Sequence, residues 1–213
     1  MRGNTDRYVL VGEGATRRGP LALADAQADP DLIPVLVGIA QGLAWTYGYL
    51  AATGWIDWLA TLPLEQRLVP PDGTRLLGVH ASPGRDDGAG AEPQMSDADL
   101  APLLAGCEAD LVCVGHTHWP QDRRVGGVRL VNVGSVSTPR IDIAPDRRAS
   151  YVLLEADADG YRLTLHRVAY DTEAVIRAID ANHAFPSPDW LAAKFAPQTP
   201  DTTSRSCASP PVS

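Results

Sequence analysis

The chain has 213 residues, enough for one domain with a sizeable hydrophobic core. It carries 18 basic and 26 acidic side chains, and the resulting net charge of −8 disfavours long nucleic acid as a partner. The three cysteines show no C-x-x-C spacing, which indicates reduced thiols in a cytoplasmic protein rather than a disulfide framework. Residues 32–62 are rich in apolar side chains, but Pro34 and four glycines interrupt them, so no membrane-spanning segment is expected.

The first third of the chain is predicted to be mainly helical. Residues 8–11 could form either a short strand or the start of a helix. Helical patterns follow at residues 21–28, 34–50 and 55–62. We therefore expect a helical cap over about residues 21–62. Its tryptophans are expected to pack in the core rather than to offer a surface for stacking bases: Trp45, Trp55 and Trp58.

Short apolar runs between turn residues predict strands after the cap. Residues 74–79 and 111–114 are the two clearest runs. The loop between them is rich in glycine and aspartate, and its Asp86-Asp87 pair is expected to be solvated. A helix should follow this loop, because Ser96 and Asp99 have the spacing of a capping box.

Two hairpins and a terminal helix complete the predicted domain, residues 1–196. The first hairpin turns at Gly126-Gly127, and the second joins strands at residues 150–156 and 161–168. Asp171 is expected to cap the helix that follows. A last short helix is predicted at residues 188–195, and a disordered tail rich in Pro, Ser and Thr at residues 197–213.

Three of the five histidines follow apolar runs that predict strands. His116 and His118 come directly after Gly115, and His80 follows the run at residues 76–79. Imidazole is a common ligand for transition metals. The alternatives are polar residues in a turn for His116 and His118, and a histidine bonded to a backbone carbonyl for His80.

A fourth candidate ligand lies in the glycine loop at the start of the chain, where Asn4 follows Gly3. Because ligand sites in α/β sheets lie at the carboxyl ends of strands, this loop and the histidine loops could converge. One amide oxygen and three imidazoles would suit a divalent manganese, iron, nickel or zinc ion. Asn4 could instead be a good turn former and nothing more.

Five short motifs occur in a fixed order along the chain. They are G-N-T-D at residues 3–6, the lone His80, G-H-T-H-W-P at residues 115–120, N-V-G-S-V at residues 132–136 and R-A-S-Y at residues 148–151. This set resembles the calcineurin-like metallophosphoesterases, specifically their bacterial branch of small phosphoesterases, from Gly3 to about Ala184. The resemblance implies an α/β four-layer sandwich, in which helices flank two mixed sheets.

The resemblance also implies a reaction and a set of site residues. Members of this family hold two metal ions and use a bridging water to hydrolyse a phosphomonoester or phosphodiester. Asn4, His80 and His116 match ligands of one metal, and His118 matches a ligand of the other. The expected catalytic residues are Asn4, Asp6 and His116.

Two residues are expected to bind substrate, namely Arg7 and Ser135. The alternatives are a surface ion pair or loop cap for Asp6 and Arg7, and a turn residue for Ser135. Trp119 could border the substrate. A small phosphate ester or a phosphoprotein is the expected substrate, because the acidic surface lacks a basic groove.

This chain also departs from the family pattern. The motifs Asp-x-His and Gly-Asp-x-x-Asp should precede G-N-x-D, but only Met1 and Arg2 do. Thr5 stands where many relatives have a histidine that can protonate the leaving group. We therefore expect an amino-terminally truncated member that lacks its first strands, binds one metal rather than two and has low or no activity. The alternative function is a catalytically impaired, truncated remnant that binds a single metal or acts as an interaction module. Self-association through an open sheet edge is a further expectation.

Overall fold

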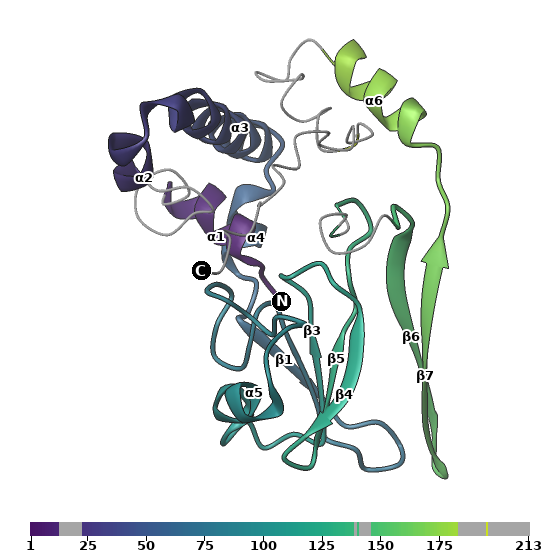
Figure 1. Ribbon diagram of the computed structural model, residues 1–213. Helices are drawn as coiled ribbons and strands as arrows, with labels where there is room; N and C mark the ends of the chain where they lie inside the picture. Colours follow the sequence, from purple (N-terminus) through teal and green to yellow (C-terminus); the bar gives the residue numbers. More distant parts are fainter. Residues whose placement is uncertain (13–22, 139, 141–145, 183–194, 196–213) are drawn as a thin grey trace, which may run out of the picture.

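Five strands form the central sheet in the computed structural model, which describes residues 1–12, 23–138, 140, 146–182 and 195 (Figure 1). In spatial order they run β1, β2, β3, β5 and β4; β2, β3 and β5 are parallel, and the edge strands β1 and β4 are antiparallel to their neighbours. Their bounds are β1 (Glu65–Leu68), β2 (Leu76–Val79), β3 (Leu111–Val114), β4 (Gln121–Val125) and β5 (Val128–Asn132). β2 and β3 read as continuous apolar runs because both faces of a parallel sheet are covered.

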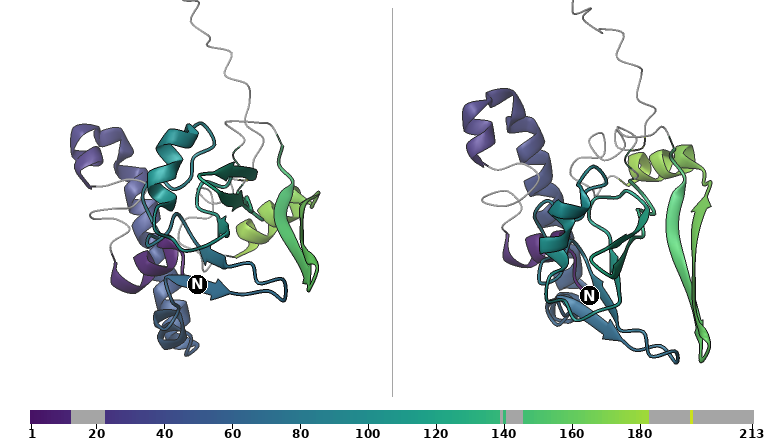
Figure 2. Two further views of the ribbon diagram at one scale, coloured as in Figure 1. Left: turned by 90° about the horizontal axis from the view of Figure 1, so that it is seen from below. Right: turned by 60° about the horizontal axis from the view of Figure 1, so that its bottom comes forward.

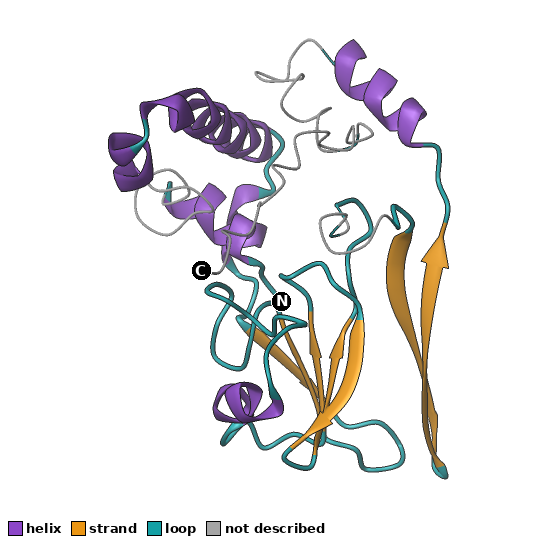
Figure 3. Cartoon of the chain, viewed as in Figure 1, coloured by secondary structure: helices purple, strands orange, loops and turns teal. Residues whose placement is uncertain are grey.

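Different elements cover the two faces of this sheet. Leu77, Val79 and Val112 point to the face that packs against α5 (Asp97–Leu104). Leu76 and Leu111 point the other way, toward the antiparallel hairpin of β6 (Ala149–Asp157) and β7 (Gly160–Val168). Figure 3 shows the sheet between α5 and the hairpin. The expected fold class is confirmed: two facing sheets with helices, the second sheet being this two-stranded hairpin.

Four helices form a layer at one end of the sheet, as the views in Figure 2 show. They are α1 (Asn4–Val11), α2 (Leu23–Ala28), α3 (Ile33–Ala52) and α4 (Ile56–Ala60), with a 3-10 turn at Pro30–Leu32. The ambiguous residues 8–11 therefore belong to a helix. Gly3 caps its start, and the Asp6 carboxylate accepts a hydrogen bond from the Gly3 N–H at 2.6 Å. The layer holds together through contacts of α1 and α4 with α3.

Helix α3 is apolar on every side, yet most of its surface is exposed. Only Leu36 and Gly38 are buried among its 20 residues. Trp55 and Trp58, beside and within α4, are 55% and 54% exposed, so the prediction that they pack in the core is wrong. The two rings instead pack edge to face, with their centroids 5.8 Å apart.

The same helix corrects the expectation that no segment is long enough to span a membrane. Pro34 lies in the first turn, where its missing N–H costs nothing, and the glycines do not interrupt the helix. Pro30–Ala52 is 23 residues long with a mean hydropathy of 1.3, so it could cross a membrane by length and composition. Core helices of soluble proteins pass the same test, and the absence of a membrane partner stays a prediction.

The remaining sequence predictions have mixed outcomes. The helix α6 (Thr172–Ala181) begins at the predicted cap, since the Asp171 carboxylate accepts a hydrogen bond from the Ala174 N–H. Both hairpins and the Ser96–Asp99 capping box are confirmed. Strand β1, with the polar sequence E-Q-R-L, was not predicted. The predicted helix at 188–195 (apart from Phe195) and the tail at 197–213 lie outside the described residues.

Candidate functional site

The loop after β3 presents His116 and His118 on a backbone that polar contacts hold in place. Both histidines have positive φ angles, 61° and 57°, which side-chain-bearing residues rarely adopt. Asn132, at the end of β5 and 1% exposed, stabilises this loop. Its side-chain N–H groups donate to the Gly115 carbonyl at 2.7 Å and to the Thr117 hydroxyl at 2.9 Å. Asn132 thus fixes the loop that carries the histidines.

The hydrogen-bond partners of these two histidines indicate which ring nitrogen carries the proton. His116 Nε2 lies 2.7 Å from the Gly88 carbonyl oxygen, and His118 Nδ1 lies 2.8 Å from the Thr138 carbonyl oxygen. Because a carbonyl only accepts, we assign the proton of each neutral ring to the nitrogen that faces it. The lone pair then lies on His116 Nδ1 and on His118 Nε2, as a metal ligand requires.

His80 joins this pair from the end of β2. Its ring packs edge to face against that of His116, with 5.2 Å between the centroids, and its backbone carbonyl accepts from the Gly115 N–H at 2.8 Å. His80 Nε2 lies 3.0 Å from Asn4 Oδ1. Burial, and then the nearby His116 and His118 rings, lower the pKa of His80, which favours the neutral imidazole. The predicted convergence of the three loops is therefore present.

Gly3 allows the first loop to approach His80. A Cβ atom at this position would lie 3.2 Å from two atoms of the His80 ring, closer than side chains normally pack. The next residues turn into α1, and this places Asn4 beside the ring. The glycine of the G-N-x-D motif thus has a packing reason that is independent of any ligand.

Asp6 and Arg7 have clear structural partners. The Asp6 carboxylate caps α1 through the Gly3 N–H. Arg7 Nε donates to Asp86 at 3.1 Å, and its Nη2 donates to Asp87 at 2.8 Å. These contacts match the alternative of a loop cap and an ion pair, and roles in catalysis or substrate binding stay predictions.

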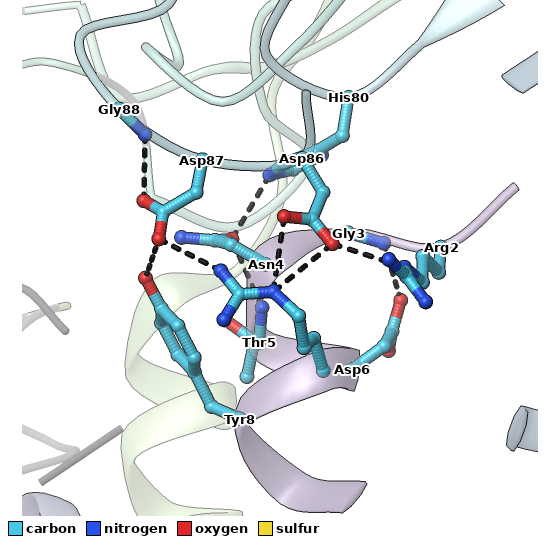
Figure 4. Close-up of polar contacts among 11 residues, drawn as sticks. Arg2, Gly3, Asn4, Thr5, Asp6, Tyr8, His80, Asp86, Asp87 and Gly88 are labelled. Atoms are coloured by element: carbon cyan, nitrogen blue, oxygen red, sulfur yellow. Dashed lines mark hydrogen bonds and ion pairs between the residues drawn. The ribbon is translucent and has the colours of Figure 1, made fainter. Parts of the chain in front are cut away.

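Asp86 and Asp87 form an ion-pair network that the sequence did not reveal (Figure 4). Asp86 is 6% exposed and also accepts from Arg2 Nε at 3.0 Å, so the prediction of a solvated loop is wrong for it. Asp87 also accepts from the Tyr8 hydroxyl and the Gly88 N–H. The network joins α1 to the loop whose Gly88 carbonyl holds His116. In the sequence, the only sign of this network is two arginines that flank G-N-T-D and two aspartates in a glycine-rich loop. No local sequence pattern predicts that Arg7 pairs with Asp86, 79 positions later.

Ser135 supports His118 rather than facing it directly. Its hydroxyl accepts from the Thr138 N–H at 3.0 Å, and Thr138 in turn bonds His118. The preceding Gly134, at φ 78°, packs so closely that a Cβ atom there would lie 2.0 Å from the Ser150 hydroxyl oxygen. The loop at 132–138 therefore sets the position of His118, and a substrate contact by Ser135 stays a prediction.

The donor chemistry of this cluster fits one divalent transition metal. Asn4 Oδ1 lies 3.0 Å from His80 Nε2 and accepts a hydrogen bond from it, so Nε2 must lose its proton before both atoms can bind one ion. However, among the described residues no group of three or more His, Cys, Asp or Glu side chains is arranged to hold a metal ion. Binding would thus require His116 or His118 to turn toward the Asn4–His80 pair.

Comparison with known proteins identifies the family of this chain. The family model of the calcineurin-like phosphoesterase superfamily domain matches residues 2–159. The structure is similar to that of the hypothetical protein PH1004 from Pyrococcus horikoshii OT3, at 17% identity and a TM-score of 0.68 over 92% of this chain and 71% of that one. It is also similar to a metallophosphoesterase from Sphaerobacter thermophilus, at 23% identity and a TM-score of 0.56 over 91% of this chain and 74% of that one.

No curated protein matches the chain. At these identities the two solved structures show the fold alone. The family model covers most of the chain and includes both histidine loops and the loop that carries Asn4. The chain therefore belongs to the calcineurin-like phosphoesterase superfamily, and this membership indicates metal-dependent hydrolysis of phosphate esters.

Proposed function

We propose that the protein binds one divalent transition metal and hydrolyses a small phosphomonoester or phosphodiester. The observation that carries the proposal is the convergence of Asn4 and His80 at 3.0 Å with the His116 ring packed against them. Asn4, His80, His116 and His118 would hold the metal, with manganese, iron, nickel and zinc all compatible with the donor set. When bound, such an ion polarises a phosphoryl oxygen and lowers the pKa of a bound water.

The protein's own groups would orient the reactants at this position. Gly88 and Thr138 hold the two loop histidines in the tautomers described above. The Thr5 hydroxyl is a poor acid at neutral pH, so protonation of the leaving group would fall to solvent or to the substrate itself. Esters of acidic alcohols, such as nitrophenols, should therefore react fastest because their leaving groups need no proton.

Metal content and phosphate release test the proposal together. We expect about one manganese ion per chain after dialysis, and slow hydrolysis of p-nitrophenyl phosphate or its bis ester. His116→Ala should abolish both. His166→Ala is the matched control because this histidine stacks on Tyr151 in the second sheet. Hydrolysis that survives His116→Ala would contradict the proposal.

A second function is favoured by the structural contacts of Asp6 and Arg7, which engage these side chains with Gly3, Asp86 and Asp87. In this alternative the protein binds a metal without turnover and serves as an interaction module. Metal retained by the wild type and lost in His116→Ala, with no phosphate released in either, would identify it. Under either function, the cytoplasmic location of the protein and its self-association through the edge strands β1 or β4 stay predictions.

A further inference from the structure

A small pocket opens beside His118, between the histidine loop and the second sheet. Trp119 and Pro120 form the apolar part of its wall, beside Ser150 and four charged residues: Arg140, Asp146, Arg148 and Arg167. Arg148 directly precedes β6, and Arg167 lies near the end of β7. Figure 1 shows that these ends of the hairpin lie at the same end of the molecule as the carboxyl end of β3. The pocket therefore adjoins the proposed reaction centre.

The charge of this pocket is opposite to that of the whole protein. Three guanidinium groups face one carboxylate, whereas the chain has a net charge of −8. Glu92, which accepts from Arg140 Nη1 at 3.3 Å, compensates one of the three cations. A positive pocket in an acidic protein attracts small anions and concentrates them there.

Asp146 arranges two of the arginines side by side. Arg148 donates to both carboxylate oxygens, from Nε at 3.0 Å and from Nη2 at 2.8 Å, and Arg167 Nη1 donates to the same group at 2.5 Å. These contacts use two N–H groups of Arg148 and one of Arg167, out of five on each guanidinium. The Arg148 and Arg167 side chains are 51% and 34% exposed, so an anion can reach them from solvent.

We propose that this pocket is an anion subsite, which binds a second phosphate or carboxylate group of the substrate. This inference rests on the proposed function, because it places the phosphate to be cleaved at His118 and the second anionic group at Arg148 and Arg167. Guanidinium groups suit phosphate and carboxylate because their planar N–H pairs match two oxygens at once. Trp119 contacts the carbon skeleton between the two groups. The substrate class is thus a small phosphate ester that carries another anion.

Direct binding tests the subsite without any need for catalysis. The probes are phenylphosphonate and benzene-1,4-bisphosphonate, which differ only in the second anionic group and are not hydrolysed. By calorimetry with manganese present, we expect the bisphosphonate to bind at least about tenfold more tightly, as charged hydrogen bonds allow. Arg148→Gln should remove most of this ratio. Arg162→Gln is the matched control, because Arg162 is 73% exposed and pairs with Glu155 near the turn of the same hairpin.

Arg167→Lys keeps the positive charge but loses the planar pair of N–H groups, so it should lower the ratio of bisphosphonate to phosphonate affinity in part. This variant tests the subsite if Arg148→Gln does not fold. Equal binding of the two probes to the wild type would overturn the proposal, as would a ratio that Arg148→Gln and Arg162→Gln change equally. Loss of the ratio in Arg148→Gln alone supports it.

Hydrolysis of a matched series separates this proposal from the proposed function. Phenyl phosphate has no second anionic group, 4-carboxyphenyl phosphate has a carboxylate, and 1,4-phenylene bisphosphate has a second phosphate. We expect kcat/KM to rise about tenfold with either anion, mainly through KM, and the larger rise to show which anion the pocket prefers. Turnover of phenyl phosphate with no gain from either anion would overturn the subsite and leave the proposed function standing. Tighter bisphosphonate binding with no turnover of any ester would overturn the proposed function and leave the anion subsite standing.

Discussion

The central sheet and the helical layer are both rich in apolar residues, yet these residues do different things. In the sheet, Leu77, Val79, Leu111 and Val112 are fully buried between α5 and the second hairpin. In the helical layer, α3 has an equally apolar sequence but buries only two of its 20 residues. Apolar composition alone therefore does not identify a core. A core also needs another apolar surface to pack against. The sheet has one on each face, α5 and the second hairpin.

The largest expected difference between the two regions is in the effect of truncating a buried side chain. Leu77→Ala should lower the free energy of unfolding by about 2–5 kcal/mol, because it leaves a cavity at the centre of the sheet. Ile33→Ala on α3, where the side chain is 48% exposed, should change it by less than about 0.5 kcal/mol. Urea unfolding measures both. Equal losses would break the comparison, since they would mean that α3 is buried in solution.

Asp86 joins the two regions, and its removal should have the next largest effect. Its carboxylate is nearly buried between Arg2 and Arg7, so Asp86→Ala leaves two cations without their shared partner. We expect a loss of about 3 kcal/mol. Asp110→Ala is the control, because its pair with Arg75 is exposed and should contribute far less. A similar effect of both substitutions would show that the network does not hold α1 to the sheet.

Local sequence signals predicted much of the sheet and little of the helical layer's packing. The runs at residues 76–79 and 111–114 and the Gly126-Gly127 turn carry their own information, since burial on both faces and a tight turn each leave a local pattern. Strand β1 has no such pattern because it is an exposed edge. Trp55 and Trp58 were misjudged for a related reason. An apolar helix without a polar face does not show which side packs.

The candidate site divides in the same way. The histidines and Asn4 were predicted because each lies at the end of a short apolar element or in a glycine loop, and such ends meet at one edge of a sheet. The groups that orient them were not predicted. Gly88 acts through its backbone carbonyl, which any residue would offer, and Thr138 acts through both its carbonyl and its hydroxyl. Asp86 acts through partners far away in sequence.

Asn132 tests whether the supporting contacts matter to the site. Asn132→Ala removes the donors to Gly115 and Thr117, and leaves the buried Gly134 N–H without its acceptor. We expect a loss of about 1–3 kcal/mol in stability and about 10–100-fold in metal affinity. Asn182→Ala, beyond the end of α6, is the control. Unchanged metal affinity would show that the histidine loop keeps its shape without Asn132.

The pH dependence of stability should report on the same network through Asp87. Burial alone would raise the pKa of Asp87, but hydrogen bonds from Gly88, Tyr8 and Arg7 outweigh it and hold the pKa below the ordinary value of 3.8. A depressed pKa stabilises the folded state above 3.8, and this contribution is lost as the pH falls through the folded pKa. The stability difference between the wild type and Asp87→Asn should therefore be constant near pH 7 and shrink below about pH 4. A difference that grows in acid would contradict this assignment.

The last prediction concerns the reactivity of the Cys113 thiol and involves no change in stability. Cys113 on β3 packs against the second hairpin, and burial raises the pKa of its thiol to about 11. Only the thiolate reacts with iodoacetamide, so at pH 8 Cys113 should be alkylated about 100-fold more slowly in the folded protein than in urea. Peptide mass spectrometry over time measures both rates. Rapid alkylation of folded Cys113, with Cys107 still protected on the opposite face, would mean that the hairpin leaves the sheet in solution. The hairpin would then be held as loosely as α3. Only the face of the central sheet that packs against α5 would still differ from the helical layer in being stably buried.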